Sequence, residues 1–223
     1  LGASRGTLPA VNSPSVSGNG SVARVVVVED PEATDAFCPR AEVVRSMVDR
    51  AVTRLTGQST TAAAWRRVLS TNGVVATNEV IGIKVFSVPG RLSGTRPAVV
   101  AAVLEGLLQT GLLPKQILVW DTKVTDLRLA GFYELADHYG VRVASAAAAG
   151  YDEQTFYESA LHPSLVWGDL EFGRKGPVVG RKSFVSKLVT REMTKIINIT
   201  PLLSHNLAGV SGNLYSLASG SVD

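Results

Sequence analysis

Short β-branched segments alternate with helical patterns through the middle of the chain, and this alternation constrains the fold more than any other feature. Residues 80–86 (VIGIKVF), 116–120 (QILVW) and 141–144 each fit a buried strand. Helical patterns separate them, with one apolar stripe over 99–108 and another helix over 125–138. Strand–helix–strand order of this kind favours parallel pairing with right-handed crossovers. We therefore predict an α/β fold with a mostly parallel sheet flanked by helices.

The segments on either side extend this pattern. Residues 22–29 (VARVVVVE) predict a further buried strand, which precedes a helix over 40–55. Residues 195–199 (KIINI) predict a fifth strand, and a short helix is expected from Asn213. Between residues 145 and 182 the periodicity weakens, which predicts an irregular insertion after the fourth strand, made of a loop and a hairpin.

Hydroxyl residues mark two expected helix starts. Ser59 or Thr60 can cap a second short helix, because a side-chain oxygen at that position accepts a backbone N–H of the first turn. Ser93 or Thr95 is expected to cap the next helix, which has Pro97 in its first turn.

Composition divides the chain into two parts. Residues 1–21 are rich in Ser, Gly, Pro and Asn, which predicts a flexible N-terminal tether. The sequence begins with Leu1, which fits the N-terminus of a mature protein after removal of a signal peptide. We therefore expect an exported, periplasmic or extracellular protein. The alternative is that the sequence was trimmed at this end. Residues 22–223 are expected to form a single α/β domain. Because the sequence ends shortly after the start of the helix expected from Asn213, we expect this domain to be incomplete at its C-terminus. A C-terminal fragment of the same precursor is an expected partner.

Charge and cysteine content narrow the classes of function. The net charge is +3, from 22 basic and 19 acidic residues that are mostly dispersed, whereas a nucleic-acid footprint clusters its basic residues. We therefore expect no nucleic-acid partner. Cys38 is the single cysteine, which excludes a cysteine-ligated iron–sulfur cluster or zinc site within this chain. No run of 18 apolar residues occurs, so we expect no transmembrane segment.

Polar side chains lie near the carboxyl ends of three predicted strands, where open parallel sheets bind their ligands. Lys84 lies near the end of one strand, Asp121 directly follows the next, and Asn198 lies in the fifth. An ammonium inside a β-branched run is costly unless it is paired, and Asp121 is a natural partner for Lys84. A lysine on a sheet edge that extends into water is the alternative.

A glycine-containing loop, SHNLAGVSGN, carries the remaining candidate residues. Histidine is the general acid–base group at neutral pH and a common metal ligand, so His205 is a candidate for either role. Nearby glycines allow close backbone approach to a ligand. The candidate ligand-binding residues are Asn198, Asn206, Ser211, Gly212 and Asn213. A surface histidine in a loop is the alternative.

These segments resemble the domain of unknown function three hundred and sixty-two family. The matching stretches are VARVVVVEDPEATD, GIKVF, SGTRPAVVAAVLEGLLQTG, ILVWD with DLRLAGF, and INITPLLSHNLAGVSGNL, in the expected order from about Val22 onward. The resemblance implies an α/β fold and, for the relatives with twin-arginine leaders, export. The histidine loop is also distantly similar to that of the lactate racemase superfamily, where such a loop closes on a nickel cofactor, although this likeness assigns no roles here.

The chain departs from that family at several polar positions. Phe86 stands where relatives have an asparagine, Leu203 stands where they have a lysine, and Tyr215 and Ser216 replace a Lys-Asn pair. Two hypotheses follow. The first is an exported enzyme with His205 as acid–base group or metal ligand and with Lys84 and Asp121 binding a small anionic group. The second, which the departures favour, is a non-catalytic binding or accessory subunit of an envelope assembly. The cofactor is left open.

Overall fold

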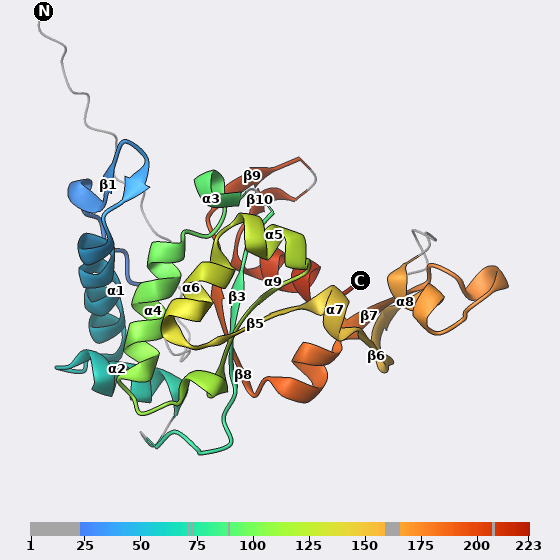
Figure 1. Ribbon diagram of the computed structural model, residues 1–223, viewed down its shortest axis with the longest axis horizontal. Helices are drawn as coiled ribbons and strands as arrows, with labels where there is room; N and C mark the ends of the chain where they lie inside the picture. Colours follow the sequence, from blue (N-terminus) through green and yellow to red (C-terminus); the bar gives the residue numbers. More distant parts are fainter. Residues whose placement is uncertain (1–22, 71, 73, 89, 159–165, 207) are drawn as a thin grey trace, which may run out of the picture.

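A four-stranded parallel sheet forms the centre of the protein, with the strand order β5–β4–β3–β8. The computed structural model (Figure 1) describes residues 23–223 apart from 71, 73, 89, 159–165 and 207. In sheet order the strands are Arg142–Ser145, Ile117–Asp121, Ile81–Val85 and Lys195–Ile199. The predicted α/β fold with a parallel sheet is thus confirmed. The predicted tether, residues 1–21, lies outside the described residues.

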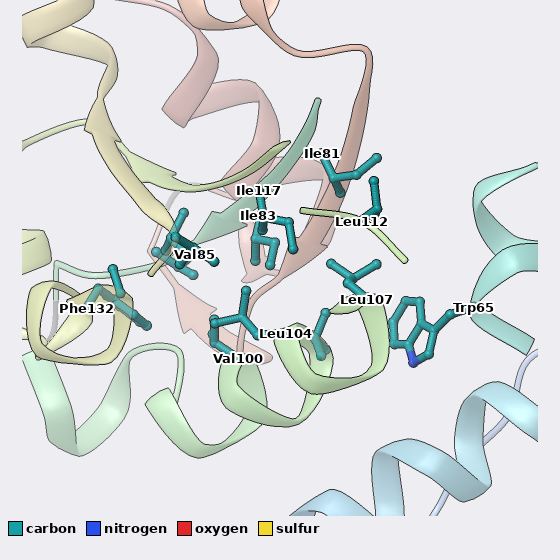
Figure 2. Packing of buried hydrophobic residues seen from close by; sticks show 14 of the residues in the cluster. Trp65, Ile81, Ile83, Val85, Val100, Leu104, Leu107, Leu112, Ile117 and Phe132 are labelled. Carbon is teal, nitrogen blue, oxygen red and sulfur yellow. The ribbon is translucent and has the colours of Figure 1, made fainter. Parts of the chain in front are cut away.

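One face of the sheet, which we call the first face, packs against a large apolar cluster. The alternation of side chains along β3 directs Ile81, Ile83 and Val85 to this side, and all three are fully buried. Figure 2 shows them against Val100 and Leu104 of the central helix α4. The helices that contribute to this cluster are α1 (Ala41–Thr56), α2 (Thr61–Leu69), α4 (Pro97–Leu108), α5 (Val124–Leu129) and α6 (Phe132–Tyr139).

The opposite side, the second face, carries a smaller apolar cluster and a charge. Leu118 and Trp120 of β4 are fully buried there, and Lys84 of β3 lies on the same side because it alternates with Ile83 and Val85. The covering elements are α7 (Ala146–Ala149), the π-helical segment η4 (Leu188–Glu192) and α9 (Asn213–Ser221). This face holds the candidate site.

The remaining elements are short or lie outside the sheet. The insertion contains the antiparallel pair β6 (Tyr151–Glu158) and β7 (Lys182–Ser186), but these strands are joined through residues 159–181, which include two short helices, rather than by the turn of the predicted hairpin. The glycine-containing loop described in the sequence analysis lies in part in the antiparallel pair β9 (Leu203–His205) and β10 (Gly209–Ser211). The others are η1 (Pro31–Ala33), β1 (Thr34–Asp35), β2 (Cys38–Pro39), α3 (Gly90–Ser93), η2 (Pro114–Gln116), α8 (Trp167–Glu171) and η3 (Gly176–Val178).

The strand predicted over 22–29 is wrong. Residues 23–30 have no regular structure, and Val25 and Val27 are 82% and 77% exposed. A β-branched run becomes a strand only where a neighbouring strand accepts its backbone hydrogen bonds. Both edges of β3 and of β4 already pair with other strands, so residues 23–30 have no free strand to pair with in the centre of the sheet.

Two helix predictions also need correction. Thr60 does cap α2, but the N-cap position of α4 is Arg96, whose side chain makes no capping hydrogen bond, so neither Ser93 nor Thr95 caps this helix. The helix predicted over 125–138 is two helices, because Gly131 adopts φ 87° between α5 and α6. Such a left-handed residue interrupts helical hydrogen bonding, and glycine adopts it at little cost.

Candidate functional site

Lys84 and Asp121 form a buried ion pair at the carboxyl ends of β3 and β4. The Nζ atom of Lys84 lies 2.8 Å from Oδ1 of Asp121, and the two residues are 1% and 3% exposed. Parallel pairing explains the contact, because neighbouring parallel strands end at the same edge of the sheet. The structure therefore brings together the lysine and the carboxylate that the sequence analysis paired.

The hydrogen bonds of this pair are satisfied within the protein. Lys84 donates to the carbonyl of Val85 at 2.6 Å, to Asp121, and to the hydroxyl of Ser216 at 3.4 Å. Asp121 also accepts from the backbone N–H and the hydroxyl of Ser87 and from the backbone N–H of Thr122. An ammonium has three N–H donors, so a ligand reaches Lys84 in this arrangement only if α9 moves.

Burial and charge act in opposite directions on Lys84. Removal from water lowers the pKa of its ammonium, and the neighbouring Asp121 carboxylate raises it; burial is the larger effect, so the pKa lies below its usual value. The ammonium also lies 5.6 Å from the centre of the Trp120 ring, whose π-face attracts a cation. A lysine with a lowered pKa is a recurrent feature of functional sites.

Helix α9 covers the pair through close packing at a glycine. A Cβ atom on Gly220 would lie 2.1 Å from Cε of Lys84, so any larger residue there requires the lysine side chain to shift. Ser216, one turn earlier on the same helix, is 1% exposed and accepts the hydrogen bond from Lys84. Ser216 and Gly220, which the sequence analysis did not select as site residues, thus place α9 against Lys84.

Asn198 lies beside Lys84 on the neighbouring strand. The register of β3 and β8 pairs the two residues directly. The chain order places β4 on one side of β3 and β8 on the other, so the strand order reverses between β3 and β8, the usual position of a ligand crevice. Asn198 donates from its side-chain nitrogen to the carbonyl of Asn213, and its Oδ1 atom is buried without a partner among the described residues.

Thr95 joins the same two strand ends. Its hydroxyl accepts from the backbone N–H of Phe86 at 2.8 Å and donates to the carbonyl of Ile199 at 2.6 Å. The residue expected to cap a helix therefore joins the carboxyl ends of β3 and β8. A sequence pattern cannot separate these two uses of a threonine, because both require only a hydroxyl near a chain reversal.

His205 pairs with Tyr215 of α9. Its Nε2 atom lies 2.8 Å from the tyrosine hydroxyl, and the backbone N–H of Ala208 donates to Nδ1 at 3.1 Å. A neutral imidazole that accepts at Nδ1 carries its proton on Nε2, so the histidine donates to the tyrosine oxygen. The tyrosine O–H then remains able to donate to a further acceptor. Both residues are half-buried, in contrast to Lys84.

The loop residues predicted to bind a ligand separate into two groups. Ser211, Gly212 and Asn213 lie at the N-terminus of α9, and Ser211 is 2% exposed with an Oγ atom that has no partner among the described residues. Asn206 is exposed in the turn that joins β9 to β10. The structure therefore gathers most of the predicted ligand residues around one helix end and leaves Asn206 at the surface.

Helix α9 links the two pairs. Its consecutive residues Tyr215 and Ser216 contact His205 and Lys84 respectively. Sequence reasoning missed Ser87 and Gly220, although a serine shortly after a strand end was a usable signal for the first. No group of three or more His, Cys, Asp or Glu side chains with the geometry to hold a metal ion occurs among the described residues.

In the part of the chain that the structure describes, no helix has the length and apolar character to span a membrane. Comparisons with protein-family models, with curated proteins and with solved structures found no match to this chain.

Proposed function

We propose that this protein is an enzyme that binds a small anionic ligand between the carboxyl ends of β3 and β8 and the N-terminus of α9. The observation that carries the proposal is the placement of Tyr215 and Ser216, which attach the half-buried His205 and the buried Lys84 to one helix. Helix α9 thereby connects an acid–base pair with a positive charge near the edge of the sheet where ligands of α/β proteins bind, which supports this proposal.

Each group has a distinct role in this proposal. The first backbone N–H groups of α9 and the unpartnered hydroxyl of Ser211 hold the anion, because helix N-termini carry positive partial charge and free donors. The hydroxyl of Tyr215 donates to the ligand, and His205 exchanges the proton with it through their hydrogen bond. Lys84, paired with Asp121, positions α9 through its hydrogen bond to Ser216. Metal ligation by His205 has no further support.

The alternative proposal is a non-catalytic accessory subunit of an envelope assembly. The saturation of Lys84 and Asp121 by partners within the chain favours it, because a charge that is fully paired needs no substrate. Export belongs to both proposals and rests on the composition of residues 1–21. Co-purification of envelope proteins from the native source, without any response to small anions, is the result expected of the subunit.

A titration of the ¹⁵N-labelled chain with inorganic phosphate tests the enzyme proposal. We expect saturable shifts of the backbone amides of Gly212 and Asn213 and of the His205 ring. Ser211→Val removes the buried hydroxyl and is expected to abolish these shifts. The matched control is Ser204→Val, which changes an exposed serine of the same hairpin. Equal responses of the two variants, or no saturable response in the unmodified chain, would contradict the proposal.

A further inference from the structure

A concave site lies between α9 and the insertion, apart from the ion pair. This cavity has a volume of about 700 Å³ and is bounded by β6, β7, η4, β8 and α9. The lining residues share small or apolar character, and they are Tyr157, Ser183, Val185, Val189, Ile196, Leu214, Leu217, Ala218, Ser219, Ser221 and Val222. Pockets that hold small molecules measure about 300–1,000 Å³, so the size is that of a ligand site.

The cavity has an apolar floor and a hydroxyl-bearing rim. Val189, Ile196 and Leu217 are half-buried and belong to or pack against the apolar cluster of the second face. Tyr157 is 71% exposed and Ser219 is exposed at the opening. The rim also includes Leu214, which is 86% exposed. The floor therefore offers only dispersion and burial to a ligand, whereas the hydroxyl of Tyr157 at the rim offers a hydrogen bond.

The walls of the cavity are fixed before any ligand arrives. Asp223 accepts hydrogen bonds from the backbone N–H groups of Phe184 at 2.7 Å and Gly168 at 2.6 Å, which ties the end of α9 to the insertion. Val222 forms an antiparallel bridge with Val185 on β7. A site whose walls are held by the fold loses little entropy when a ligand binds.

We propose that this cavity binds a neutral amphiphile with a single hydrocarbon chain. The chain lies on the floor formed by Val189, Ile196 and Leu217, and an uncharged polar head bonds to the hydroxyls of the rim. No charged side chain lines the cavity among the described residues, so nothing there offsets the cost of desolvating an ionised head. Burial of hydrocarbon surface supplies the affinity. This proposal does not depend on the anion site at the N-terminus of α9.

Calorimetric titration with decanol, with decanoate as the charged comparison, tests the proposal on the full chain. We expect saturable binding of decanol and at least tenfold weaker binding of decanoate. Ala218→Trp fills the opening from an exposed position of α9, and we expect it to weaken decanol binding by about tenfold or more, which corresponds to ~1.4 kcal/mol. The matched control, Ala41→Trp, changes an exposed residue of α1 and is expected to leave the affinity unchanged.

A smaller substitution and a titration with phosphate distinguish a failure of this proposal from a failure of the proposed anion site. Ala218→Leu fills less of the opening and is expected to weaken decanol binding by an intermediate amount. Phosphate-induced amide shifts at Gly212 are expected to persist in the Ala218 variants, since Ala218 lies more than one helical turn from Gly212 along α9. Equal affinities for decanol and decanoate, or equal effects of the Ala218 and Ala41 variants, would overturn the proposal whether or not phosphate binds.

Discussion

The two faces of the sheet are built from the same strands but are held by different forces. On the first face, alternate residues of β3 are Ile81, Ile83 and Val85, and every one is fully buried against helices (Figure 2). On the second face the intervening residues are Gly82 and Lys84, and the cover consists of short elements with a large cavity between them. Apolar burial specifies the first face, whereas the second combines a smaller apolar cluster with one ion pair and a few hydrogen bonds.

The largest expected effect is a loss of stability when a charge is removed from the second face. Asp121→Ala leaves the buried ammonium of Lys84 unpaired, and loss of one member of a buried pair costs about 3–5 kcal/mol. Urea unfolding, followed by circular dichroism, measures the loss. The double variant Lys84→Met with Asp121→Leu is the control, because two apolar residues need no partner; it is expected to recover most of the stability. A loss below about 1 kcal/mol for Asp121→Ala, the range of an exposed pair, would contradict the buried pair.

Truncation of a leucine on each face measures how tightly each is packed. Leu104→Ala on the first face removes a fully buried side chain and is expected to cost about 3 kcal/mol, within the range for buried leucines. Leu217→Ala on the second face removes a half-buried side chain that borders the cavity, and about 1 kcal/mol is expected. The two free energies of unfolding come from the same urea experiment. If the losses are equal, the faces do not differ in packing as described.

A methyl group added to a glycine on each face tests local fit. Gly220→Ala brings a Cβ to 2.1 Å from Cε of Lys84, and Gly106→Ala brings one to 2.0 Å from Nε1 of Trp65. Overpacking of this kind costs roughly 1–3 kcal/mol at either site. Only Gly220→Ala is expected to shift the NMR signals of His205, because only it displaces α9. Unchanged His205 signals in that variant would show that α9 does not couple the two pairs.

The smallest effect concerns pH. Burial and a hydrogen bond with the Glu105 carboxylate raise the pKa of Tyr139 to about 12, and burial with the negative charges of Asp223 and Glu171 raises that of Tyr151 to about 12. A tyrosine whose pKa is raised by folding contributes its full stabilisation at pH values below its pKa in the unfolded chain, which is about 10. This stabilisation is lost as the pH rises through the pKa of the tyrosine in the folded protein. Stability is therefore expected to fall between about pH 10 and 12.

Tyrosinate absorbance measures these titrations directly. Tyr139→Phe is expected to remove one of the high-pH titrations and to leave that of Tyr151 in place, since Tyr139 lies on α6 and Tyr151 on β6 and no residue contributes to both pKa shifts. Titration of all tyrosines near pH 10, the value of a solvated tyrosine, would contradict the burial described.

The sequence predicted elements that have a marked apolar pattern better than their pairing and their ends. Residues 195–199 were expected to form a strand and do so with identical bounds, and the helix expected over 40–55 is α1. Both depend on periodic burial, which a sequence displays directly. The strand expected over 22–29 failed because pairing is a property of the whole sheet, and the helix over 125–138 failed because one glycine adopts a left-handed conformation.

The candidate site was predicted in its chemistry but not in its contacts. A lysine in an apolar strand and an aspartate after the next strand suffice to predict a pair, because parallel strands share an edge. The partners from α9 were missed, since Ser216 follows Lys84 by 132 positions and no short-range pattern connects them. Whether His205 acts on a ligand stays a prediction, and so does the extent of the domain beyond the described elements.

The cover that α9 places on Lys84 also bears on the order in which the chain folds. Asp121 follows Lys84 by 37 positions, whereas Ser216 follows it by 132. Because synthesis proceeds from the N-terminus and distant contacts close more slowly, β3 and β4 pair while the segment that covers them has yet to emerge. The ammonium therefore keeps its hydration until the last helix docks, and dehydration of that single charge is expected to be a late event of folding.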